Sequence, residues 1–137
     1  MKVLVMYSKE FSYHPTIKNL DSAEDINEGN QFDNCILAFI QIEKEDEQLD
    51  VKSREKKLVN HLKWTARKNN TKNVVLHSFA HLSDSKASLT FTKAIFNEAE
   101  KRLQNGGYIT AQTPFGYFLD LNIQAPGYSL ARIFASL

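Results

Sequence analysis

The sequence has 137 residues and a formal net charge of +1, with 42% hydrophobic and 24% charged residues. This composition is that of an ordinary globular domain, and the near-neutral charge excludes the overall positive field by which many nucleic-acid-binding proteins are recognised. The single cysteine, Cys35, excludes a disulfide framework and a cysteine-based zinc site. We therefore expect one domain over residues 1–137.

The first part of the chain predicts two strands separated by a polar segment. The apolar run at residues 2–8, KVLVMYS, is typical of a strand buried on both faces. Residues 8–33 are polar and irregular, and we expect a loop there with at most a small strand. Residues 34–44 are rich in Ile and Phe, which favours a second strand.

A helix is predicted next. Asp50 or Ser53 caps it, it runs to about residue 68, and its apolar residues form one stripe at helical spacing. One local basic cluster lies on or just after this helix and consists of Lys56, Lys57, Lys63, Arg67, Lys68 and Lys72. The cluster is interpreted either as a solvated face or as an edge that faces RNA.

The second half predicts a strand at 73–79 and a helix over 86–104, capped from within residues 83–85. Glycines at its end are typical of a helix C-terminus. Residues 108–124 predict two strands that meet as a hairpin about Pro114–Gly116, and the tail that follows has a last helical turn or strand. The predicted fold is a single α/β domain, with a sheet of about five or more strands covered by two helices.

Candidate chemistry centres on the turn after the third predicted strand. The chain has no glycine-rich phosphate loop, no HExxH motif and no GxSxG motif. His77 and His81 are four residues apart, but a strand followed by a loop does not present them as a metal pair. His81 lies at the carboxyl end of a strand and before a capped helix, where ligands bind in open α/β sheets and where backbone N–H groups face an oxyanion. A structural loop histidine remains the alternative, as does plain packing for Pro114–Phe118.

Four segments carry a family resemblance over nearly the whole chain. They are KVLVMYS, AFIQIEK at 38–44, FAHLS at 79–83 and PFGY at 114–117. In this order and spacing they resemble the archaeal-type N-terminal editing domain of threonyl-tRNA synthetase, whose fold is shared with D-aminoacyl-tRNA deacylases.

The resemblance implies a proofreading hydrolase of protein biosynthesis in the cytoplasm. A binding pocket gains only about 1–3 kcal/mol from one methyl group, so a threonine enzyme needs a second site to remove serine. The expected reaction releases serine from mischarged seryl-tRNA(Thr), with the 2′-hydroxyl of the terminal adenosine assisting water. The expected partners are the 3′ acceptor end of tRNA(Thr), a second copy in a two-fold dimer through the sheet edge, and the rest of a synthetase in cis or in trans. No metal, organic cofactor or membrane is implied.

The resemblance also implies site residues. His81 matches a catalytic position. The matching substrate-binding positions are Ile42, Phe79, Ala80, Pro114, Phe115, Gly116, Tyr117, Phe118, Leu119 and Arg132.

Three of these positions depart from the family pattern. Phe118 and Leu119 stand where the family has a tyrosine and a lysine, and Arg132 stands where it has a glutamate. By strand alternation Leu119 shares a face with Leu121 and Ile123. The departures leave three interpretations: a deacylase that works at a lower rate, a tRNA-binding or dimerisation module without activity, or a deacylase with another substrate such as D-aminoacyl-tRNA.

Overall fold

One long strand organises the sheet in the structure, a computed structural model that describes all 137 residues. The strand β1 (Lys2–Lys18) pairs antiparallel with β2 (Asn30–Gln41) along one edge. Along its other edge, its first half pairs with β6 (Arg132–Ser136) and its second half with β5 (Tyr117–Gln124). A single strand therefore pairs with three others.

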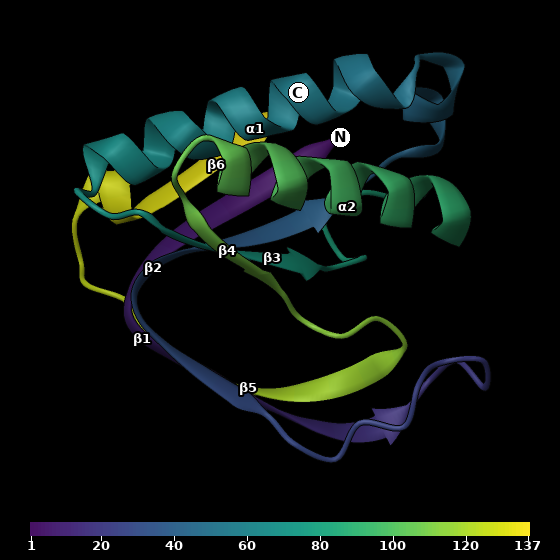
Figure 1. Cartoon of the computed structure of the whole chain (residues 1–137), viewed down its shortest axis with the longest axis horizontal. Coiled ribbons are helices and arrows are strands. Elements are labelled where there is room, and N and C mark those ends of the chain that lie inside the picture. The colour runs from purple at the N-terminus through teal and green to yellow at the C-terminus, as the bar shows by residue number, and fades with distance from the viewer.

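The remaining strands extend the sheet on the side of β2. The strands β3 (Asn73–Ser78) and β4 (Ile109–Gln112) follow in parallel, so the order is β4-β3-β2-β1-β5 with β6 also beside β1. The sheet curls strongly, because the distal halves of β1 and β2 bend away from the helices and carry β5 with them (Figure 1).

Both helices cover the same face of the sheet (Figure 1). They are α1 (Val51–Lys68) and α2 (Leu89–Asn105), and two short 3-10 helices, η1 (Lys44–Gln48) and η2 (Ser129–Ala131), lie in connections. Neither α1 nor α2 has the length and apolar character needed to cross a membrane. The expected α/β class, with two helices over a sheet of at least five strands, is confirmed.

Apolar residues are buried on both faces of the sheet, which explains the continuous apolar run of β2. Ile36, Ala38 and Ile40 point into the main core between the sheet and the helices. Leu37 and Phe39 point to a second cluster inside the curl of the sheet. Alternation in a strand sends successive side chains to opposite faces, so a strand buried on both sides needs apolar residues throughout.

The structure corrects the prediction for residues 8–33. Most of this segment is strand, because β1 continues to Lys18 and β2 begins at Asn30. The distal half of β1 has exposed polar side chains, so it lacks the apolar pattern that reveals a buried strand. Pro15 is tolerated because the pairing of β1 with β2 ends at Tyr13, and the pairing with β5 is irregular just after the proline.

The predicted hairpin at 108–124 is also wrong. Strands β4 and β5 form there, but they lie at opposite ends of the sheet, where β4 pairs with β3 and β5 pairs with β1. The Pro114–Gly116 corner therefore connects strands at the two ends of the sheet and does not close a tight turn. A local sequence pattern reveals the two strands and the corner but not their partners, which are distant in sequence.

The helix caps were predicted with mixed success. Asp50 caps α1, and its carboxylate accepts a hydrogen bond of 2.6 Å from the Ser53 backbone N–H. The helix α2 begins later than predicted, because Ser88 is its cap and accepts from the Phe91 N–H. Residues 83–85, which were predicted to cap it, belong to a loop that contacts β2.

Candidate functional site

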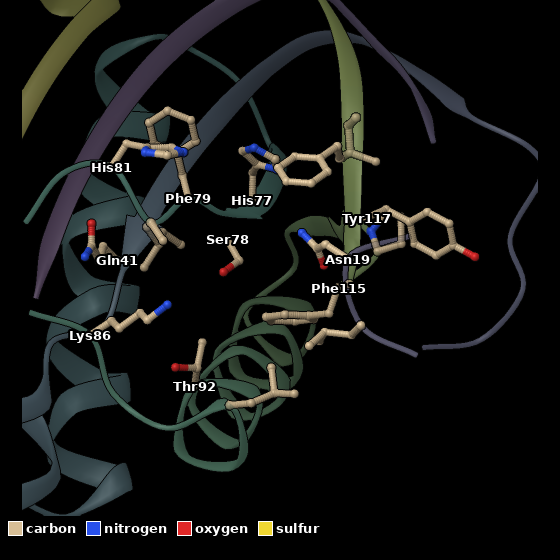
Figure 2. Close-up of a pocket in the computed structure, with 18 of the residues that line it drawn as sticks. Asn19, Gln41, His77, Ser78, Phe79, His81, Lys86, Thr92, Phe115 and Tyr117 are labelled. Atoms are coloured by element: carbon tan, nitrogen blue, oxygen red, sulfur yellow. The ribbon is translucent and has the colours of Figure 1, made fainter. Parts of the chain in front are cut away.

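A cavity of about 590 Å³ lies between the two ends of the curled sheet. One wall consists of the ends of β2 and β3, the loop at 78–87 and the start of α2, and the other consists of the 114–121 segment and the turn after β1. Figure 2 shows side chains from both walls facing one open space. All the residues that the sequence assigned to the site line this cavity, except Arg132: Ile42, Phe79, Ala80, His81, Pro114, Phe115, Gly116, Tyr117, Phe118 and Leu119.

The side chain of Gln41 fixes the loop of the first wall. Its Oε1 accepts hydrogen bonds from the backbone N–H groups of Leu82 and Ser83, at 2.6 and 2.9 Å. Its Nε2 donates to the carbonyls of Ser83 and Ser85, at 2.9 and 2.8 Å. All four bonds are made from a side chain that is only 4% exposed, so the loop is held tightly to β2.

Three serines tie the loop and the start of α2 to the acidic helix η1 and to its N-cap residue Glu43. The hydroxyl-to-carboxylate bonds are Ser83 to Glu43 at 2.7 Å, Ser85 to Glu45 at 2.9 Å and Ser88 to Glu47 at 3.1 Å. Burial disfavours a charge on Glu43, but hydrogen bonds from the Met1 amino group and from Ser83 outweigh it and lower the pKa of Glu43 to about 2. The serines predicted as caps thus have another structural role.

His81 is exposed and free in this wall. Its ring packs edge-on against Phe79 at 5.0 Å, and its imidazole makes no hydrogen bond within the protein. The backbone N–H groups of Ala80 and His81 likewise donate to no protein group. Sequence analysis expected a helix N-terminus here, but α2 starts farther on; the free N–H groups belong to the turn itself.

His77 also lines the cavity, although no sequence pattern assigned it to the site. It is buried on β3, its Nδ1 lies 2.8 Å from the Thr113 Oγ1, and its ring packs edge-on against Phe39. Burial lowers the pKa of His77 to about 4, so the imidazole is neutral at neutral pH. A neutral imidazole held by Thr113 is suited to positioning and not to accepting a proton.

The second wall is anchored at three consecutive residues. The Phe115 ring packs edge-on against Phe96 of the core at 5.2 Å. Gly116 has φ +84°, a conformation that glycine adopts without strain, and its carbonyl accepts from the Asn19 N–H at 2.8 Å. The Tyr117 hydroxyl donates to the Glu24 carbonyl at 2.7 Å, so this hydroxyl holds the turn after β1.

The positions that depart from the family pattern are not all in one place. Phe118 and Leu119 line the cavity, and Phe118 is 59% exposed. Leu121 lines it as well, as the predicted alternation requires, while Ile123 packs on the second apolar cluster. Arg132 is exposed at the start of β6, beside Met6, and lies away from the cavity.

Residues missed by the sequence analysis complete the lining, chiefly Asn19, Gln41, Ser78, Lys86 and Thr92. For Gln41 a signal was present, because a glutamine inside the apolar run AFIQIEK must have buried partners. The others come from loops, from the end of β3 and from the start of α2, where no sequence period indicates direction. No group of three or more His, Cys, Asp or Glu side chains is arranged to hold a metal ion.

Comparison with solved structures defines the class of fold first. The structure superposes on the c-Myc DNA Unwinding Element Binding Protein with a TM-score of 0.67 and 15% sequence identity, over 100% of this chain and 99% of that chain. At this identity the likeness establishes the architecture alone. The expected fold, α/β and D-aminoacyl-tRNA deacylase-like, is confirmed.

Sequence comparison then identifies the family. The family described as the archaea-specific editing domain of threonyl-tRNA synthetase matches residues 1–137, and this chain belongs to it. The threonine–tRNA ligase of Thermococcus sibiricus is 30% identical over 136 residues, and that of Methanococcus maripaludis strain C5 is 34% identical over 135 residues. Each match covers 97% of this chain and only 22% or 21% of the relative. The chain thus spans about a fifth of the length of these ligases.

Proposed function

We propose that this chain hydrolyses the ester bond of mischarged seryl-tRNA(Thr) and releases serine. The observation that carries the proposal is the cavity in which the 79–81 turn and the 114–117 corner face each other, although they are distant in sequence. Membership of the editing-domain family over the whole chain supports the same reaction.

The reaction is the attack of water on the ester carbonyl at the 3′-oxygen of the terminal adenosine. The 2′-hydroxyl of the substrate assists this water, and His81, free and exposed at the cavity wall, is the side chain that we assign to proton transfer. The unpaired N–H groups of Ala80 and His81 bind the aminoacyl group. The apolar side chains of Phe115, Phe118 and Leu119 pack against the adenine base.

The proposal places the domain in the cytoplasm with tRNA(Thr), as a two-fold dimer through the sheet edge and in cis or in trans with the rest of a synthetase. It includes no metal or organic cofactor. Arg132 has no part in the cavity of one chain, so we assign it no contact with the reacting group.

A deacylation panel tests the proposal. The purified domain is incubated with L-seryl-tRNA(Thr), L-threonyl-tRNA(Thr) and a D-aminoacyl-tRNA, and the released amino acid is measured over time. We expect the seryl ester to be cleaved fastest and well above its spontaneous rate. Release of serine at the spontaneous rate from a folded sample would reject the proposal. Faster cleavage of the D-aminoacyl ester than of the seryl ester would mean that D-aminoacyl-tRNA is the substrate.

A binding module without activity is the second candidate, and the apolar Leu119 favours it, since the family has a lysine there. It predicts tRNA binding that weakens with salt and no cleavage. The wild-type panel distinguishes the two, and Leu119→Lys then tests position 119, whose side chain lines the cavity. We expect this variant to raise the deacylation rate, by up to about tenfold; an unchanged rate would show that position 119 has no catalytic role.

A further inference from the structure

One charged side chain lines the cavity, and neither the sequence nor the family resemblance assigned it a role. Lys86 is the only lining residue with a permanent charge, and no carboxylate is among the lining residues. Figure 2 shows its side chain extended from the loop into the space between Ser78 and Thr92. Its ammonium group forms no ion pair and no hydrogen bond within the protein, although other lysines do, such as Lys2 and Lys18.

The backbone on both sides of Lys86 is fixed to β2 and its continuation. The Ser85 carbonyl accepts from Gln41 Nε2 at 2.8 Å, and the Ala87 N–H donates to the Ile42 carbonyl at 2.9 Å. The backbone at Lys86 is therefore held in place by its neighbours. The side chain itself is not held by an ion pair. An unpaired cation on a fixed segment of a cavity wall is suited to bind negative charge on a ligand.

We propose that the Lys86 ammonium group stabilises the negative charge that develops on the ester carbonyl oxygen during hydrolysis. This inference rests on the proposed function. Ser78 directly precedes the turn whose free N–H groups we assigned to the aminoacyl group, so Lys86 reaches the aminoacyl side of the cavity. The wall opposite offers Leu119 where the family has a lysine, so this chain supplies an ammonium group from another element.

In the proposed step, the water oxygen bonds to the carbonyl carbon and the carbonyl electron pair moves onto its oxygen. Lys86 donates a hydrogen bond to this oxyanion and keeps its own proton. The oxyanion then re-forms the C=O bond as the bond to the 3′-oxygen breaks, and a proton from the attacking water ends on that 3′-oxygen. Charge and protons balance without an external reactant.

Lys86→Met tests the role in single-turnover and steady-state deacylation of L-seryl-tRNA(Thr). Removal of an oxyanion donor typically costs about 10²–10³ in kcat, and solvent screening of an exposed lysine reduces this, so we expect a loss of about 10- to 100-fold in kcat with KM nearly unchanged. Lys86→Arg should recover part of the loss. Lys101→Met, which changes an exposed lysine of α2 outside the cavity, is the matched control and should match the wild type.

The outcomes separate this inference from the function on which it rests. If wild-type protein cleaves the ester and Lys86→Met retains kcat within twofold, the inference is wrong and the function stands. A rise in KM alone, with a shallower salt dependence, would also overturn it and would assign Lys86 to a phosphate of the tRNA. Failure of the wild-type protein to cleave would reject the proposed function itself. Circular dichroism and thermal melting confirm that each variant is folded.

Discussion

Replacing Gln41 by methionine should loosen the loop that bears His81 and Lys86. The change removes four hydrogen bonds and leaves two backbone N–H groups and two carbonyls without their partner. At about 0.5–1.5 kcal/mol net for each bond the sum is about 2–6 kcal/mol. Because water can reach part of the loop and replace some of these bonds, we expect a loss of about 2–3 kcal/mol in the free energy of unfolding.

Urea unfolding measures this loss, with an unchanged dependence on denaturant as evidence that the unfolded state is the same. Hydrogen exchange gives the local result: the Leu82 and Ser83 amides should exchange faster, while those of β3 should not. Gln124→Met is the matched control, since Gln124 is exposed on β5 and its side chain makes no hydrogen bond. A loss below about 0.5 kcal/mol with unaltered exchange would refute the view that Gln41 fixes the loop.

Two further predictions concern stability. His77 has a pKa of about 4 when folded against an ordinary 6.5, so the unfolded state binds more protons between these values, and stability should fall by about 3 kcal/mol as pH drops from 6.5 to 4. Urea titrations over this range should show a shallower fall for His77→Gln; equal slopes would exclude His77 as the cause. Gly116→Ala should cost at least about 1 kcal/mol more than Gly107→Ala, because both have positive φ but only at Gly116 would the new Cβ clash, at 2.6 Å from the Ala23 Cβ. Equal denaturation midpoints would contradict the close packing of the 114–117 corner.

The features that could be predicted from the sequence are those with local causes. The cap at Asp50 needs only the next three residues, and the continuous apolar run of β2 is complete within the strand itself. The hairpin prediction failed because β4 and β5 each find a partner elsewhere in the sheet, which no local pattern encodes. The turn that contains FAHLS was located by its place between a predicted strand and a predicted helix, whereas PFGY was assigned to the site only through the family resemblance.

Other parts of the site depend on contacts that no sequence window contains. Gln41 is visible as a polar residue in an apolar run, but its four partners lie about 40 positions away. The place of the Lys86 backbone follows in part from the same bonds, because they hold its loop to β2. Because residues 8–33 were predicted as a loop, the second half of β1 was missed. This is the strand with which β5 pairs, so the position of the second wall could not be predicted either.

The two walls of the cavity belong to two parts of one bent sheet. The strand β5 hydrogen-bonds only to β1 (Figure 1). Along β1 the pairing partner changes from β6 to β5. Asn34 of β2, which has a left-handed conformation with φ +48°, lies opposite the place of this change. On one side the helix α2 joins the two walls, because its start lines the first wall and its Phe96 packs against Phe115 of the second. On the other side the bend of the sheet sets the spacing of the walls, through residues that do not line the cavity. If the proposed function holds, this bend also limits the size of the amino acid that fits between the walls. Under the proposed function, sheet curvature contributes to selectivity, and changes at Asn34, which does not line the cavity, should alter the choice of substrate while leaving the lining intact.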